Sequence, residues 1–220
     1  MKINFRYDAE KDTWCLKTKG PSSNNSAKPT KTYLQLTKKH GPHPSDAQIA
    51  RFIKQEIETN YDIDSSLQSW ASHWETIEHA YHYAAERVFR TSINRDLTGY
   101  ATVNTRCPYN LEEGWFFIAL SQANPSPIIM HELWHFYTWE QFGATEHDRL
   151  GARNYNTIKE SLTVLLNIEC ANLFPHDKKD LGYPQHLELR KRITEWWHTK
   201  PDIQYIWERA SRFIEANTEV

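Results

Sequence analysis

The most regular pattern in the chain is a helical repeat of apolar residues between positions 66 and 90. Residues spaced three or four positions apart fall on one face of an α-helix, so this pattern predicts one long helix with a single buried side. We expect that helix to back a small sheet. The repeat consists of Trp70, Trp74, Ile77, Tyr81, Ala84 and Val88.

Other apolar runs have the length and spacing of strands. Residues 3–7 and 14–16 alternate apolar with polar positions around a charged turn, which predicts an N-terminal β-hairpin, and residues 33–36 predict one more short strand. Residues 98–105 and 114–121 predict two further strands. The second contains a continuous apolar run at 115–120, as in a strand covered on both faces.

Capping residues and prolines mark the remaining helices. Ser45 predicts a helix that runs to about residue 58, and Ser126 with Pro127 predicts one over 126–141 that Gly143 ends. The fold class is therefore expected to be α+β, with a small mixed sheet and a mostly helical C-terminal third. We expect residues 1–40 to form a hairpin and loop appendage and residues 41–220 one domain. Further helices are predicted at 155–173, 184–198 and 202–217.

Composition narrows the class of protein. The formal net charge of −2 offers no basic field for nucleic acid, and no apolar run approaches the roughly 20 residues that a membrane span needs. Residues 1–12 are charged and unlike a signal peptide. The three cysteines form no C-x-x-C pair, which favours free thiols in a reducing compartment. We therefore expect a cytoplasmic protein that binds neither nucleic acid nor membrane.

The segment His131-Glu132-Leu133-Trp134-His135 carries the clearest chemistry in the chain. Two histidines four positions apart lie one helical turn apart, about 6 Å along the axis, so both imidazoles can reach one Zn²⁺. The glutamate beside the first histidine can take a proton from a water molecule whose pKa the metal has lowered. The segment thus predicts zinc as the cofactor, His131 and His135 as ligands, and Glu132 as the catalytic base.

A catalytic zinc usually has a third protein ligand, and Glu160 is the first candidate. It lies in a predicted helix beside the apolar positions Ile158 and Leu162, where a carboxylate is costly to bury unless it is paired or binds a metal. His147, twelve residues after His135, is the alternative. Glu169 and Asp148 are weaker candidates.

With Glu160 on a downstream helix, the motif resembles the gluzincin branch of the zincin metallopeptidases. The resemblance covers about residues 65–173 and implies a zincin-like fold and hydrolysis of peptide bonds in a peptide or protein substrate. In such enzymes an edge strand binds the substrate, a role that would fall to residues 114–121 or 99–105. The chain departs from the thermolysin-like pattern, because Val164 stands where an aspartate would orient a ligand histidine. It also lacks the metzincin pattern, since Thr138 and Gln141 replace the required glycine and histidine.

Three alternatives remain open at this point. The spacing to His147 is loosely similar to that of SprT-like DNA-repair proteases, in which case His147 would be the third ligand. The site could also belong to a zinc hydrolase that acts on a non-peptide amide, or to a catalytically silent zincin-like binding protein.

The resemblance also implies a residue that stabilises the oxyanion, because related enzymes use a Tyr or His from beyond the glutamate helix. Tyr183 and His186 are the first candidates, in a turn that leads into the next predicted helix. Tyr155 and His176 are the fallbacks.

Overall fold

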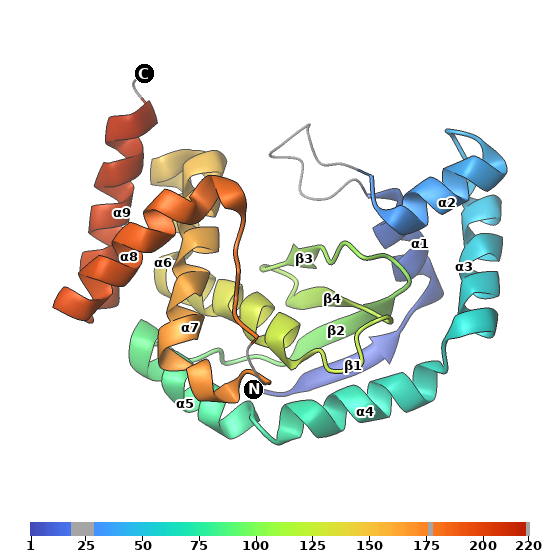
Figure 1. Ribbon diagram of the computed structural model, residues 1–220, viewed down its shortest axis with the longest axis horizontal. Coiled ribbons are helices and arrows are strands. Elements are labelled where there is room, and N and C mark those ends of the chain that lie inside the picture. Colours follow the sequence, from blue (N-terminus) through green and yellow to red (C-terminus); the bar gives the residue numbers. More distant parts are fainter. Residues whose placement is uncertain (19–28, 176–177, 219–220) are drawn as a thin grey trace. The chain divides into compact units, whose positions relative to one another are not determined.

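The computed structural model describes residues 1–18, 29–175 and 178–218 and shows an α+β protein (Figure 1). The chain divides into two compact units. Unit 1 comprises Met1–Thr76 and Asn94–Ser126, and unit 2 comprises Ile77–Ile93 and Pro127–Val220. The domain boundary expected at residue 40 stays a prediction. Within the described residues, no helix is long and apolar enough to cross a membrane.

Unit 1 is built on an open four-stranded sheet with the order β1-β2-β4-β3 (Figure 1). β1 (Ile3–Tyr7) pairs in parallel with β2 (Leu97–Thr102), and β2 pairs in parallel with β4 (Trp115–Ala119). The short β3 (Tyr109–Asn110) runs antiparallel to β4. The mixed sheet and the strands expected within 98–105 and 114–121 are therefore confirmed. Every residue of β4 is buried, as its continuous apolar run predicts. Because β4 is flanked on both sides, the edge role expected for residues 114–121 does not fit it.

The predicted N-terminal hairpin is wrong, because only its first half is a strand. Residues 14–16 lie in helix α1 (Ala9–Lys17), whose first amides are capped by the side chain of Asp8. The buried residues of α1 are Asp12, Cys15 and Leu16, which have helical spacing. The strand expected at 33–36 is also a helix, α2 (Lys31–His40), capped by Thr30. In both cases a cap satisfies the free helix amides, and this outweighs a short alternating pattern.

The predicted long helix over 66–90 is two helices. α4 (Ile63–Glu75) packs on β1 in unit 1, with the rings of Trp70 and Phe5 6.5 Å apart. α5 (Glu78–Phe89) belongs to unit 2. The chain leaves helical geometry at Ile77, where φ is −122° and ψ is −11°. The apolar spacing continues through this break, so the pattern contains no sign of it. The helix expected after Ser45 is confirmed as α3 (Asp46–Asn60), with a capping box formed by Ser45 and Gln48.

A buried carboxylate joins α1 to the end of β2. Asp12 is fully buried, and its Oδ1 accepts hydrogen bonds from Thr102 Oγ1 at 2.5 Å and from the Val103 amide at 3.3 Å. Burial raises the pKa of Asp12 to about 7, although these hydrogen bonds oppose the rise. Below about pH 7 the folded protein therefore favours the protonated acid.

This burial predicts a pH-dependent effect of Asp12→Asn on the free energy of unfolding. Because the folded pKa exceeds the unfolded one, the contribution of Asp12 is fully present below about pH 4 and is lost as pH rises through about 7. The free energy of unfolding of Asp12→Asn minus that of the native protein should therefore rise by roughly 4 kcal/mol from pH 4 to pH 8, because the native protein loses this stability and the variant does not. Urea unfolding at both pH values measures the shift, and a difference that is constant with pH would contradict it.

Every regular element in the described residues of unit 2 is a helix or a helical turn. Its longest element, α6 (Ser126–Leu162), is interrupted by non-helical backbone at Gly143 and Gly151, where φ is 24° and 74°. The helix expected over 126–141 is confirmed, except that its first amide is capped by Asn124, whose Oδ1 accepts from Ser126 N–H. The short turns and helices that follow in the chain are η1 (Thr163–Leu165), α7 (Leu166–Glu169), η2 (Ala171–Leu173), η3 (Pro184–His186), α8 (Leu187–Thr199) and α9 (Ile203–Thr218).

The core of unit 2 fixes the first part of α6 against α5. Trp134 is fully buried, with its ring 4.8 Å from that of Phe89 and 6.4 Å from that of Tyr81. Tyr81 Oη also donates to the carbonyl of Met130 at 2.9 Å. The motif helix thus turns its apolar side into the core, which leaves its histidines on another face.

Candidate metal centre

Two imidazoles converge on the first turns of α6. The Nε2 atoms of His131 and His135 lie 3.0 Å apart, with the ring planes at 80° to one another. His135 is almost completely buried, and the His131 side chain is 20% exposed. The site is therefore set into the protein, with access at His131.

The last helical segment of α6 brings a carboxylate to the same point. Oxygens of Glu160 lie 3.4 Å from His135 Nε2 and 3.6 Å from His131 Nε2. Trp134 Nε1 donates to the carbonyl of Leu162 at 3.1 Å, which ties this segment to the motif helix. The sequence expectation that Glu160 joins the two histidines therefore agrees with the geometry.

These three side chains fit the donor set of a metal ion. Tetrahedral ligands at 2.0–2.1 Å from a metal lie about 3.3 Å from one another. The two Nε2 atoms lie 3.0 Å apart, and one oxygen of Glu160 lies 3.4 Å from His135 Nε2 while the other lies 3.6 Å from His131 Nε2. With one ligand atom taken from each residue, all three atoms lie within 4.8 Å of one another. Glu160 Oε2 is buried and has no hydrogen-bond partner, as expected for an atom that would bind a cation. Among the described residues, His131, His135 and Glu160 form the group that could hold a metal ion.

A buried lysine holds the other oxygen of this carboxylate. Lys159 is fully buried, and its Nζ donates to Glu160 Oε1 at 2.8 Å. Burial alone would raise the pKa of Glu160, but its contacts with the two histidines and the charge of Lys159 hold it well below its usual value. The Glu160 side chain is therefore in its ionised, carboxylate form at neutral pH.

Glu132 is buried beside the group without belonging to it. It is 7% exposed, and its Oε2 has no hydrogen-bond partner. Burial, reinforced by the negative charge of Glu160, raises its pKa to about 7 against the opposing charge of His131. The site thus contains a basic oxygen that no protein group occupies.

The two histidines have opposite proton affinities. Burial opposes protonation of His131, but the hydrogen bond to Asp180 and the nearby carboxylate of Glu160 outweigh it and raise the pKa of His131 to about 10. Burial lowers the pKa of His135 to about 3. A metal ion that binds here must displace a proton from His131, because a ligand imidazole needs a free lone pair.

Asp180 is a residue of the site that the sequence analysis missed. Its Oδ2 lies 2.6 Å from His131 Nδ1, and its Oδ1 lies 2.9 Å from Arg190 Nη2. It stands in irregular chain 49 positions after His131, with no periodic pattern around it that could have indicated its place.

The other ligand candidates lie in different surroundings. His147 contacts the rings of Trp139 and Tyr155, and its Nδ1 lies 3.6 Å from Asp148. Glu169 binds Arg87 and accepts from Trp197 Nε1. None of His147, Asp148 and Glu169 belongs to the group of three described above.

The residues expected to stabilise the oxyanion lie in different surroundings. The His186 ring is half-buried, with Nδ1 buried and lacking a hydrogen-bond partner, and the charges of Glu160, Arg190 and Lys159 act on it. Burial lowers its pKa. Tyr183 is 50% exposed. Tyr155 is buried, with its ring 5.5 Å from that of Trp207, and His176 lies outside the described residues. Among the three described candidates, His186 is favoured because the charge of Glu160 acts on the pKa of its side chain.

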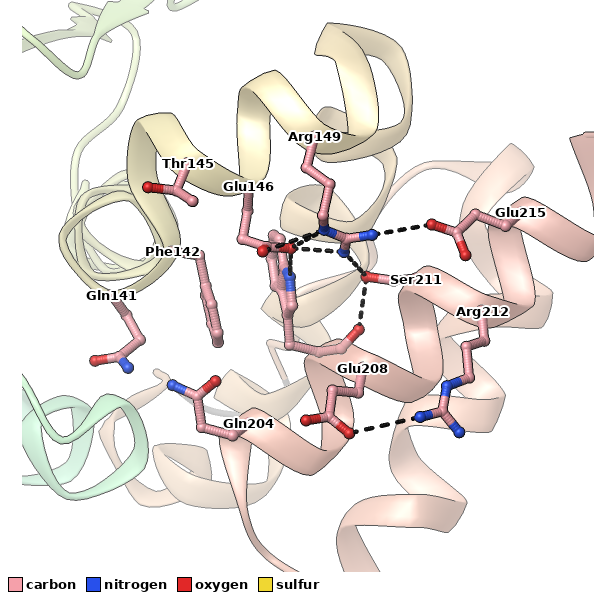
Figure 2. Close-up of a pocket in the computed structure, with 11 residues that line it drawn as sticks. Gln141, Phe142, Thr145, Glu146, Arg149, Gln204, Glu208, Ser211, Arg212 and Glu215 are labelled. Atoms are coloured by element: carbon pink, nitrogen blue, oxygen red, sulfur yellow. Dashed lines mark hydrogen bonds and ion pairs between the residues drawn. The ribbon is translucent and has the colours of Figure 1, made fainter.

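A pocket of unit 2, apart from the candidate metal centre, lies between the middle segment of α6 and α9 (Figure 2). Its charged groups satisfy one another. Arg149 binds Glu146 at 2.6 Å and Glu215 at 3.0 Å, and Arg212 pairs with Glu208 at 3.9 Å. A pocket whose charges are already paired in this way offers no group of its own for chemistry.

Comparisons with models of protein families, with curated proteins and with solved structures give no match for this chain. Function is therefore inferred from the geometry of the site in unit 2.

Proposed function

We propose that the protein is a zinc-dependent metallopeptidase of the zincin type. The observation that carries this proposal is the convergence of His131, His135 and Glu160 within metal-binding distance of one another, beside the buried carboxylate of Glu132. Two imidazoles and one carboxylate form the ligand set of several catalytic zinc sites, which leaves the fourth position for water or substrate.

The residues divide the chemistry between them. Zinc, when bound, polarises the scissile carbonyl and makes a water molecule more acidic. Glu132 takes a proton from that water while the oxygen of the water forms a bond to the carbonyl carbon. It then gives the proton to the amide nitrogen as the C–N bond breaks, which yields a carboxylate and an amine. The buried Oε2 of Glu132 is available for this transfer because no protein donor occupies it.

The proposal is tested by incubating the zinc-loaded protein with a peptide library and identifying new termini by mass spectrometry. Cleavage is expected that a chelator abolishes and added zinc restores. Tight zinc binding without cleavage of any library member would contradict the peptidase assignment. It would favour a silent zinc-binding protein or a hydrolase for non-peptide amides.

His186 is expected to assist turnover by donating to the oxyanion. We expect His186→Ala to lower kcat by about 10²–10³-fold, as loss of an oxyanion donor does elsewhere, with zinc content and thermal stability unchanged. Tyr183→Phe is the matched variant on the same turn, and its effect should be much smaller because that side chain is half exposed. Native kcat in His186→Ala would remove His186 from the mechanism.

A further inference from the structure

Asp180 connects the candidate zinc ligand His131 to three other elements of unit 2. Its carboxylate bonds His131 in α6 and Arg190 in α8, and lies 2.7 Å from Thr163 Oγ1 in η1. Its backbone N–H and C=O form a reciprocal pair with the side chain of Asn167 in α7, at 2.8 Å each. Asp180 is thus held at both its side chain and its main chain.

We propose that Asp180 is the positioning residue of the metal centre, and that through it zinc binding is coupled to the docking of residues 178–187. This rests on the proposed zinc site. The coupling gives the segment a function, because the segment also carries His186, on which the charge of Glu160 acts. Metal binding and the placement of that histidine would then occur together.

The contact with His131 selects the form of the imidazole that can bind a metal. A carboxylate only accepts hydrogen bonds, so His131 Nδ1 must be the donor in the 2.6 Å contact with Asp180. In the neutral ring this leaves the lone pair on Nε2, the atom that faces His135 Nε2 at 3.0 Å. The geometry of Asp180 therefore favours the tautomer that ligation requires.

Arg190 fixes the second carboxylate oxygen of Asp180, and a guanidinium can only donate hydrogen bonds, never accept them. Arg190 Nη2 donates to Oδ1 at 2.9 Å and to the main-chain oxygen of the same residue at 2.7 Å. Arg190 and Asp180 are buried, with side chains 5% and 8% exposed. An asparagine at position 180 would therefore place its NH₂ group either against the Arg190 donors or against His131 Nδ1. The first choice is repulsive, and the second would move the ring proton to Nε2.

The segment also fits closely around Arg190. Gly182 has a φ of +61°, and a Cβ atom there would lie 2.6 Å from the Arg190 guanidinium. The three atoms nearest to this Cβ all belong to Arg190, so an alanine at this position would push the guanidinium away from Asp180. Gly182→Ala is thus a second, independent way to loosen the contact.

The test compares Asp180→Asn with Asp202→Asn for zinc affinity, measured by competition with a chromophoric chelator. Asp202 is also an aspartate of unit 2 paired with an arginine, Arg90, at 3.0 Å, and an asparagine still caps α9. We expect Asp180→Asn to bind zinc about 10–100-fold more weakly, the usual cost of losing such an orienting partner, and Asp202→Asn to bind as the native protein does. Gly182→Ala should also weaken binding.

Hydrogen exchange provides a measurement that a purely structural role of Asp180 would not change. In the native protein, zinc should slow amide exchange across residues 178–187, including Asp180 N–H, which donates to Asn167. In Asp180→Asn this zinc-dependent protection should be lost.

The measurements distinguish a failure of the proposed function from a failure of the role proposed for Asp180. A native protein that binds no zinc contradicts the proposed function itself. A native protein that binds zinc, with Asp180→Asn folded and binding equally tightly, overturns the role of Asp180. Exchange in residues 178–187 that does not respond to zinc overturns the coupling. If Asp180→Asn does not fold, native zinc affinity in Gly182→Ala overturns the proposal.

Discussion

Replacement of Glu132 by Gln is expected to reduce peptide hydrolysis by about 10²–10⁴-fold, the range typical of a lost general base. The substitution preserves the shape of the side chain and removes its basicity. Zinc content should be unchanged, because Glu132 lies outside the group of three ligand candidates. Initial rates and metal analysis of the same preparation measure both quantities.

Glu140→Gln is the matched control for this substitution. It makes the same chemical change on the same helix at an exposed position, so its turnover should equal that of the native protein. Hydrolysis at the native rate by Glu132→Gln would show that the base has been assigned to the wrong residue. Loss of zinc in Glu132→Gln would instead make Glu132 a ligand.

Replacement of Glu160 by Ala is expected to weaken zinc binding by at least about 100-fold, more than the loss of an outer partner usually costs. The structure places its carboxylate 3.4 Å from His135 Nε2 and 3.6 Å from His131 Nε2. Glu160→Gln is the milder companion, because it keeps an acceptor for the buried Lys159 while it removes the negative charge. Both variants should be checked for folding by circular dichroism.

His147→Ala is the comparison that separates the two third ligands considered from the sequence. The His147 side chain is 38% exposed and contacts Trp139 and Tyr155, so its loss should leave zinc affinity unchanged. Weaker binding in His147→Ala with native binding in Glu160→Ala would exchange their roles. It would also favour the SprT-like alternative.

Much of the candidate centre could be predicted because its ligands obey local rules. His131 and His135 occupy one helix face by their spacing, and Glu160 stands out as a carboxylate among apolar positions whose burial needs compensation. Asp180 obeys no such rule. It reaches His131 through an irregular segment whose path depends on Asn167 and Arg190, which are separated from it in the chain.

The errors in the fold have a similar cause. Residues 14–16 alternate like a strand, but Asp8 caps a helix there, and the end of β2 receives the buried Asp12 of that helix. The break at Ile77 preserves the apolar spacing on both sides, so the pattern could not show that Trp74 and Tyr81 belong to different units. Short apolar patterns therefore located the elements better than they assigned their type or their ends.

The most direct test of the central claim is the zinc content of the purified, zinc-equilibrated protein, measured by mass spectrometry of the metal against protein concentration. The native chain is expected to hold about one zinc, and the double variant His131→Ala/His135→Ala to hold almost none, since it loses two of the three ligands. Near-native zinc occupancy in the folded double variant would contradict a metal centre at this position.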